Sequence, residues 1–239
     1  MRGCLTLLVL MATILVASWL FLPTVAGKVV DGALGQAGFA GSPTDVSVSS
    51  DPPIELLAGH ADRVIVQATD ATYRELTAAA INVTLTDVNL INRTAGTVQG
   101  SLTGIRIRPS SGHLLPISSA TVSGSGSAIQ ARLSLSAADV SAMAASAVTS
   151  VAGSAPSKVT MASPDKVTIV VGGITVSGRA AVDAQGGLVF RPTTKGSVIV
   201  GPIDLIRPGP DMPLRIRTIA LTASGAILTA TMDPTAFSG

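Results

Sequence analysis

The chain has 239 residues, enough for one large domain with a substantial core, and 47% of them are hydrophobic whereas 13% are charged. Aromatic residues make up only 3%, so the apolar content comes from Val, Ile, Leu and Ala, and this excludes an intrinsically disordered chain. The net charge of +2 comes from scattered Lys and Arg residues, without a basic run or interleaved aromatic side chains, which excludes a nucleic-acid-binding surface.

The chain begins with a long uncharged apolar segment. Arg2 is followed by no charged residue until Lys28, a pattern typical of a secretory signal peptide or of an uncleaved membrane anchor. The small residues that end at Ala26 favour cleavage there slightly over anchoring. We therefore expect residues 1–26 to be a signal peptide or N-terminal anchor. Residues 27–239 are expected to form a single exported domain in the cell envelope, outside the cytoplasmic membrane, secreted or N-terminally anchored.

The segment that follows is unusually rich in glycine. Within residues 27–42, glycine occurs at every third position, at Gly32, Gly35, Gly38 and Gly41. Each glycine inside a helix costs about 1 kcal/mol relative to alanine, which argues against an isolated helix. A helix pressed closely on a sheet could use this glycine face, so a linker and a packed helix fit the pattern equally well.

A short helical turn and a series of strands are predicted next. Over residues 51–59, Asp51 can cap the turn, Pro52 suits its first position and Gly59 suits its end. From there to residue 133 the chain is rich in Val, Ile and Thr and is interrupted by Gly and Ser pairs. This pattern predicts an antiparallel meander.

Within the meander, the apolar alternation changes phase at Asp87. Val83 and Leu85 share one face, but the pattern resumes one position late at Val88. A one-residue slip turns every later side chain to the other face unless an extra residue is absorbed, so we predict a β-bulge near Asp87 that curves the sheet. An ordinary loop between two short strands is the alternative. A similar break at residues 217–218 predicts a second bulge.

The clearest predicted helix covers residues 137–152. Ser136 and Asp139 form a capping-box pattern, and Gly153 follows the last turn. Apolar residues recur at helical spacing and require one buried face; they are Val140, Met143, Ala144, Ala147, Val148 and Val151. We expect this face to pack on a sheet rather than to hold a cofactor.

Further strands follow this helix and are separated by three turn signals. Gly172 and Gly173 lie between two β-branched runs, which is a strong signal for a two-residue hairpin turn. Residues 183–187, with the sequence DAQGG, indicate a second turn, and Ser224 with Gly225 indicates a third.

No catalytic or metal-binding constellation is apparent in the sequence. His60 and His113 are the only histidines, and each has a turn-like setting without a carboxylate or second histidine at ligand spacing, so we expect surface loop residues and no metal site. No serine lies in a Gly-x-Ser-x-Gly elbow, the acidic residues are dispersed, and the single cysteine, Cys4, precedes the exported domain. We therefore expect a protein that is not an enzyme and uses no cofactor.

The remaining signal is abundant aliphatic surface on a curved sheet with few helices to cover it. If the concave side stays open, each methylene of an acyl chain buried there is worth about 0.8 kcal/mol. Ordinary core packing is the simpler alternative for every residue that we assign to the groove lining: Val83, Leu85, Val88, Leu90, Val140, Met143, Ile169, Val171, Ile174, Val176, Leu214, Ile216, Ile219 and Leu221.

Four arginines could meet lipid phosphates at the rim of such a groove, because charge-assisted hydrogen bonds to phosphate are strong. They alternate with apolar neighbours, and solvated positions on the outer face are favoured for all of them: Arg106, Arg108, Arg215 and Arg217.

Several stretches resemble the LmeA family of phospholipid-binding proteins from actinobacterial cell envelopes: DRVIVQATD, AAINVTLTDVNLINRTAGTVQGSLTGIRI, SAADVSAMAASAV and DMPLRIRTIALTASGAILTATMD. The resemblance runs from about residue 29 to residue 235. It implies an α+β domain of the tubular lipid-binding type, in which a long curved antiparallel β-sheet wraps around one or two helices and holds acyl chains in an elongated groove. It also implies phospholipid binding and a part in the maturation of envelope lipoglycans. Residues 27–42 depart from the pattern, since such proteins tend to have a better helix there.

We therefore expect an exported envelope protein that binds phospholipid or another acyl lipid in an apolar groove at a membrane surface, with no nucleic-acid or metal partner. Support of lipid transport or of lipoglycan maturation would follow from this activity. The alternative is a structural or adhesive β-rich envelope module with a fully packed core. An enzyme acting on lipid-linked sugar is a third hypothesis, for which the sequence offers no acid, base or nucleophile constellation.

Overall fold

The computed structural model describes residues 23–232 except 37, 43, 74–75, 93, 108–114, 127, 194–200 and 207–213. A helix covers residues 23–36, a 3-10 helix η1 covers Pro53–Ala58, and helix α2 covers Ala137–Ala152. The larger of two antiparallel sheets contains β1 (Phe39–Ala40), β2 (Thr44–Ser49), β3 (His60–Tyr73), β4 (Leu76–Asn89), β5 (Thr94–Ile107), β6 (Leu115–Ser125), β7 (Ala128–Ser136), β13 (Leu214–Thr222) and β14 (Gly225–Met232). The smaller contains β8 (Lys158–Ala162), β9 (Lys166–Val171), β10 (Ile174–Val182), β11 (Leu188–Pro192) and β12 (Ile203–Ile206).

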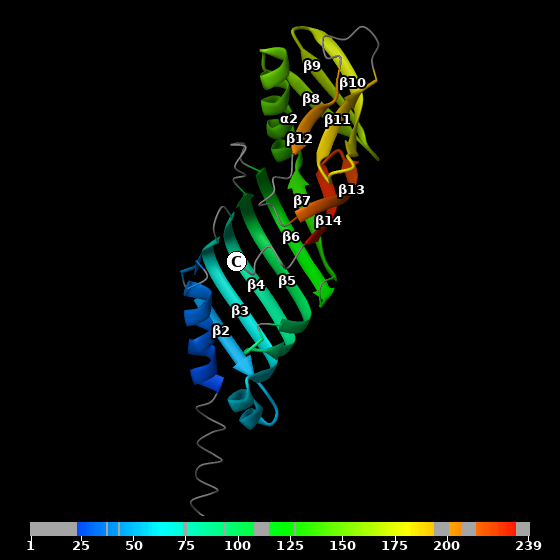
Figure 1. The fold of residues 1–239 in the computed structure, drawn as a ribbon. Helices are drawn as coiled ribbons and strands as arrows, with labels where there is room; N and C mark the ends of the chain where they lie inside the picture. Colours follow the sequence, from blue (N-terminus) through cyan, green and yellow to red (C-terminus); the bar gives the residue numbers. More distant parts are fainter. Residues whose placement is uncertain are drawn as a thin grey trace, which may run out of the picture.

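The two sheets lie one beyond the other along an elongated molecule (Figure 1). The larger has the order β1-β3-β4-β5-β6-β7-β14-β13, with β2 also paired to β3, and the smaller has the order β12-β11-β10-β9-β8. Helix α2 joins them, because it follows β7 and packs on β12, β14 and β8. The predicted α+β class with a long antiparallel sheet is confirmed, although the strands divide between two sheets.

The glycine-rich segment is a packed helix up to residue 36, and it lies against β2 (Figure 1). A Cβ atom added to the buried Gly27 would lie 2.7 Å from the carbonyl oxygen of Val46. Gly32 and Gly35 have no neighbour within 4 Å of such an atom, so the packing requires glycine only at Gly27. The predicted domain boundary after Ala26 falls inside this helix. None of the helices in the described part of the chain has the length and apolar character needed to span a bilayer.

Helix α2 has the predicted boundaries and the predicted cap. The Ser136 hydroxyl oxygen accepts a hydrogen bond from the Asp139 backbone N–H at 3.1 Å, and the Asp139 carboxylate accepts one from the Ser136 backbone N–H at 3.2 Å. Gly153 ends the helix with a left-handed φ of 69°. The buried face contains Val140, Met143, Ala144 and Val148. Val151 is 60% exposed, so the buried stripe is one turn shorter than predicted.

The predicted hairpin turns are present. Gly172 and Gly173 have φ values of 57° and 80° and connect β9 to β10, as a two-residue hairpin with left-handed backbone requires. Residues 183–187 connect β10 to β11, and Ser224 lies in the turn between β13 and β14.

The cap predicted for the turn at residues 51–59 is wrong. Pro52, with an extended backbone, is the N-cap residue of η1, and no side chain caps this helix. The backbone N–H of Asp51 instead donates a hydrogen bond to Asp62 Oδ2 at 2.7 Å. Gly59 ends η1 with a left-handed φ of 76°, as predicted.

The second predicted bulge is confirmed. The pairing of β13 with β14 shifts between Ile216 and Thr218, which leaves Arg217 as the extra residue. Because one residue is absorbed there, Ile216 and Leu221 are both buried although they differ in parity.

At Asp87 the phase does change, but the structure has neither the predicted bulge nor the alternative loop. Strand β4 is continuous through Asp87, and its register with β3 and β5 does not shift. Asp87 has a left-handed φ of 53°, which reverses the alternation without adding a residue. Asp62 on β3 and Gly96 on β5 lie opposite Asp87. The residues on either side of Asp87 pair regularly with both neighbouring strands, but Asp87 itself pairs with neither.

A second row of this kind crosses four strands. Asp70 on β3, Ala79 on β4, Gly104 on β5 and Ser118 on β6 lie opposite one another, again at omitted pairs. Asp70 and Gly104 have φ values of 48° and 58°. All four strands therefore change phase at the same level, and the register is kept. Two transverse rows, rather than one bulge, interrupt the regular pleat of the larger sheet.

Candidate functional site

Between these two rows, one face of the larger sheet is apolar from β3 across to β14. Residues paired across strands share a face, and alternate residues along a strand share it too. Three successive levels of paired residues on this face contain only aliphatic side chains and glycine: Ala68, Ile81, Leu102, Ala120, Leu133 and Leu228; Val66, Val83, Gly100, Val122, Ala131 and Ala230; and Val64, Leu85, Val98, Gly124 and Ile129.

The opposite face of β4 to β7 is polar. Two paired rows on β4 to β7 lie between the apolar levels and point to the other side: Asn82, Ser101, Thr121 and Arg132; and Thr84, Gln99, Ser123 and Gln130. The sheet is therefore amphipathic, and its apolar face requires a cover.

The two ends of the apolar face are covered by different parts of the chain. Toward β2 and β3, the helix of residues 23–36 contributes apolar side chains to a cluster that includes Val64 and Val66; they are Ala26, Val30 and Leu34. Toward β14, α2 and the smaller sheet form the main core with Leu133 and Leu228. Side chains at these ends are buried, with Val64 at 1% exposure and Leu228 also at 1%.

Between the covered ends, the apolar face is only half-buried. We call this part the central strip, and its residues are Val83, Leu85, Val98, Gly100, Leu102, Val122, Gly124 and Ile129. They lie on β4 to β7 between the helix of residues 23–36 and the α2 core (Figure 1). Val83, Leu102 and Val122 pack against the main core, and Leu85 packs against the cluster beside the helix. Half-buried aliphatic side chains in contiguous positions still have free energy to gain from an apolar ligand.

Two glycines shape the floor of the central strip. At Gly100 an added Cβ would lie 2.8 Å from Val83 Cγ2 and 3.0 Å from the Asn82 carbonyl oxygen. Gly124 is equally restricted, because the Ala128 carbonyl oxygen would be 2.3 Å away. Both positions expose backbone instead of a side chain, which is typical of places where another chain or a ligand comes close.

The structure distributes the predicted groove residues over several places. Val83 and Leu85 lie in the central strip. Buried in the main core are Val140, Met143, Ile169, Val171, Val176, Ile216 and Leu221, with the half-buried Ile219 packed against them. Val88 is buried and Leu90 half-buried in the cluster beside the helix of residues 23–36. Ile174 is 44% exposed at the β9–β10 turn, and the side chain of Leu214 lies outside the described part of the chain.

Val140 and Met143, two of the predicted lining residues, lie on α2, and the interface between α2 and the sheets is closed. Met143 is 8% exposed and Val148 is fully buried against the sheets. The central strip lies beside this contact, and sequence reasoning missed four of its large side chains: Val98, Leu102, Val122 and Ile129. Their signal in the sequence is alternation with polar residues, as in Val98-Gln99-Gly100-Ser101-Leu102.

Polar groups gather outside the apolar face at the row of Asp70 and Gly104. An open hollow of about 560 Å³ lies there, and its charged lining residues are Asp70, Arg106 and Asp139. Arg106, Arg215 and Arg217 are exposed, as their interpretation as solvated outer-face residues predicts. Arg108 lies outside the described residues.

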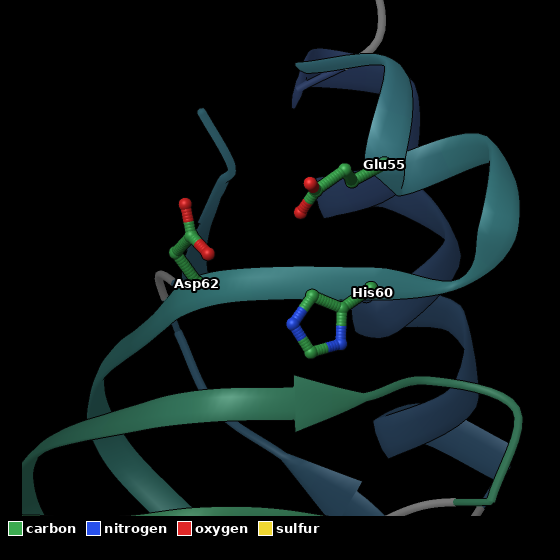
Figure 2. Close-up of side chains that lie close together, drawn as sticks. All are labelled: Glu55, His60 and Asp62. Carbon is green, nitrogen blue, oxygen red and sulfur yellow. The ribbon is translucent and has the colours of Figure 1, made fainter. Parts of the chain in front are cut away.

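His60 has neighbours that its sequence context did not predict. It is the first residue of β3, and the ligand atoms of Glu55, His60 and Asp62 all lie within 4.8 Å of one another (Figure 2). The expectation that His60 is a surface loop residue is therefore wrong, because it begins strand β3, is half-buried and has two carboxylates nearby. The left-handed turn at Gly59 folds η1 back toward β3, which brings Glu55 to the strand. His113 lies outside the described residues.

A family model described as LmeA-like phospholipid-binding matches residues 20–231. The chain belongs to the LmeA-like phospholipid-binding family. The match covers both sheets and α2, so it confirms the resemblance seen in the sequence, and it supports phospholipid as the ligand class. Comparisons with curated proteins and with solved structures found no significant match.

Proposed function

We propose that the protein binds phospholipid with the acyl chains lying on the central strip. Membership of the family supplies the ligand class. The observation that carries the proposal is the strip itself, a contiguous set of half-buried aliphatic residues on a sheet whose two ends are buried. Val98 and Ile129 illustrate it best, since both are half-buried and neither belongs to a core cluster of the described residues.

The energetics of an acyl chain fit such a surface. A buried methylene contributes about 0.8 kcal/mol, so ten methylenes that lose their water contribute roughly 8 kcal/mol. Ordering of the chain and loss of translational freedom offset part of this gain. Specificity for the number or length of chains does not require polar contacts on the strip itself.

The membrane surface is the second element of the proposal. Three of the largest exposed aliphatic side chains belong to η1 and to the turn after β4: Ile54 at 60% exposure, Leu57 at 70% and Ile91 at 72%. Ile54 and Leu57 share one side of the 3-10 helix, since residues three apart are eclipsed. Ile91 lies beside Gly59, where an added Cβ would be 2.5 Å from Ile91 Cγ1. We call these residues the apolar tip, and it suits insertion between lipid headgroups.

Export delivers the domain to the outer side of the cytoplasmic membrane, with the apolar segment before residue 23 acting as signal peptide or anchor. There the apolar tip contacts the bilayer and the central strip accepts lipid. Support of lipid transport, or of the maturation of lipid-linked envelope glycans, follows from moving lipid between a membrane and an acceptor.

One observation favours a structural or adhesive module as a second candidate. Most of the groove residues predicted from the sequence are ordinary core, for example Ile169 at 0% exposure and Val176 at 1%. In that case the central strip would be covered by another part of the protein and would hold no lipid.

Lipid content distinguishes the two candidates. The full chain, purified from membranes and shown to be folded by circular dichroism, is extracted with organic solvent and its phospholipid is quantified by mass spectrometry. We expect phospholipid in near-stoichiometric amount, retained after repeated washing. A folded sample that retains no lipid and binds none when phospholipid is added back would refute the proposed function.

A further inference from the structure

A second kind of site is present where η1 meets the start of β3, away from the central strip. Glu55 comes from η1, and His60 and Asp62 come from one side of β3 (Figure 2). Their ligand atoms all lie within 4.8 Å of one another. Glu55 and His60 are half-buried and Asp62 is exposed, so the cluster is accessible from solvent.

Backbone and side-chain contacts hold two of these carboxylates in place. Asp62 Oδ2 accepts the hydrogen bond from the Asp51 backbone N–H at 2.7 Å. Glu55 Oε2 lies 3.4 Å from the hydroxyl of Ser50, the one buried polar residue among those that the structure describes. The left-handed turn at Gly59 fixes η1 relative to β3. The donors therefore converge through the local fold and not through contacts with one another.

Among the described residues, the charged groups that contact the cluster are carboxylates. A further carboxylate, Asp87 on β4, has its Oδ1 4.0 Å from His60 Nε2. Within the described part of the chain, no Lys or Arg forms an ion pair with Glu55, Asp62 or Asp87. Three carboxylates near one imidazole favour a bound cation, because it would relieve their mutual repulsion.

The donor set indicates the class of cation. Imidazole nitrogen combined with carboxylate oxygen, without thiolate, suits a borderline divalent ion such as Zn²⁺, which takes three protein ligands and leaves one position open. Two ligands of one tetrahedral Zn²⁺ ion stand about 3.3–3.6 Å apart, given metal–ligand bonds of roughly 2.0–2.2 Å. The ligand atoms here all lie within 4.8 Å of one another, so side-chain rotations that shorten the longest separation would accompany binding.

We propose that Glu55, His60 and Asp62 form a binding site for a divalent transition-metal ion, with Asp87 beside the open coordination position. The ion would connect η1 to β3. Since Ile54 and Leu57 belong to η1, metal binding would also fix the apolar tip on the sheet. This site is independent of lipid binding by the central strip.

The test measures Zn²⁺ binding to the full chain by isothermal titration calorimetry. We expect saturable binding of one ion per chain, and a reduction in affinity of at least tenfold in each of Glu55→Gln, His60→Gln and Asp62→Asn. The matched control is His113→Gln, which removes the other histidine and should bind Zn²⁺ as the wild type does. Asp62→Asn keeps an acceptor for the Asp51 N–H, so it serves as the folded variant if His60→Gln is unstable.

Thermal unfolding provides a second readout. A ligand that binds only the folded state raises Tm, so Zn²⁺ should raise Tm in the wild type and in His113→Gln but not in His60→Gln. Absence of saturable Zn²⁺ binding by the wild type would overturn the proposal, as would undiminished binding by folded His60→Gln and Asp62→Asn. Tighter binding of Ca²⁺ or Mg²⁺ than of Zn²⁺ would overturn the assigned class of ion.

Discussion

Replacing Val98 and Val122 with threonine tests the contact between lipid and the central strip. Both residues are half-buried on the apolar face, Val98 on β5 and Val122 on β6. Threonine has nearly the shape of valine but carries a hydroxyl, so the Val98→Thr/Val122→Thr variant changes the chemistry of the strip and hardly its volume. The free protein should tolerate it, because hydroxyls at half-buried positions keep contact with water.

The expected loss of affinity follows from the cost of covering these hydroxyls with an acyl chain. Burial of a hydroxyl without a hydrogen-bond partner costs about 1–3 kcal/mol in proteins. Two such groups cost about 2–6 kcal/mol, which corresponds to lipid binding weakened roughly 30-fold or more. Stability of the lipid-free protein should fall by less than about 1 kcal/mol, a change in Tm of roughly 2–4 °C at most.

The assay is calorimetric titration of the full chain with a short-chain phospholipid below its critical micelle concentration. The control is Thr103→Val/Thr121→Val, which makes the reverse exchange at exposed positions on the polar face of the same two strands. Its affinity should equal that of the wild type. Wild-type affinity in the Val98→Thr/Val122→Thr variant would refute the assignment of the strip, and so would an equal loss in the control.

Three further outcomes are expected. Gly27→Ala should lower the free energy of unfolding in chemical denaturation, because the added Cβ would lie 2.7 Å from the Val46 carbonyl oxygen. Gly32→Ala should raise this free energy by about 1 kcal/mol. Equal effects of the two substitutions would contradict the packing of the helix. Ser136→Ala removes the α2 cap and should cost about 1 kcal/mol, or roughly 2–4 °C in Tm, while Ser146→Ala on the exposed side of α2 should cost nothing. Replacing Ile54, Leu57 and Ile91 of the apolar tip with serine should abolish co-sedimentation with phosphatidylglycerol vesicles. Binding of short-chain lipid should stay intact. Unchanged co-sedimentation would contradict the membrane-contacting role.

Features with local signals were predictable from the sequence. The cap at Ser136, the stop at Gly153 and the turn at Gly172 each depend on residues adjacent in the chain, and the structure confirms all three. The bulge at Arg217 was equally visible, because two apolar runs of different parity had to be reconciled within one strand.

The phase change at Asp87 shows why other features were not predictable. A single strand records only that the alternation slips, and an added residue or a left-handed residue gives the same pattern. The left-handed φ of Asp87 keeps the register because Asp62 and Gly96 on the neighbouring strands stand at the same level. That alignment is a property of three strands together.

The central strip and the metal-ligand cluster depend on tertiary arrangement in the same way. The burial of Val64 and the partial exposure of Val98 depend on where the helix of residues 23–36 lies on the sheet, which neither strand's sequence reveals. Glu55 and His60 meet because the Gly59 turn reverses the chain. Spacing along the sequence, taken as a guide to metal ligands, did not reveal that approach.

Photo-crosslinking tests the central claim most directly. The full chain is incubated with a phospholipid that carries a diazirine near the end of one acyl chain, irradiated, digested and analysed by mass spectrometry. The proposed site predicts adducts on β4, β5 and β6, at or beside Leu85, Val98 and Val122, and their loss when unlabelled phospholipid competes. Competable adducts confined to α2 and the smaller sheet, with none on these strands, would contradict it.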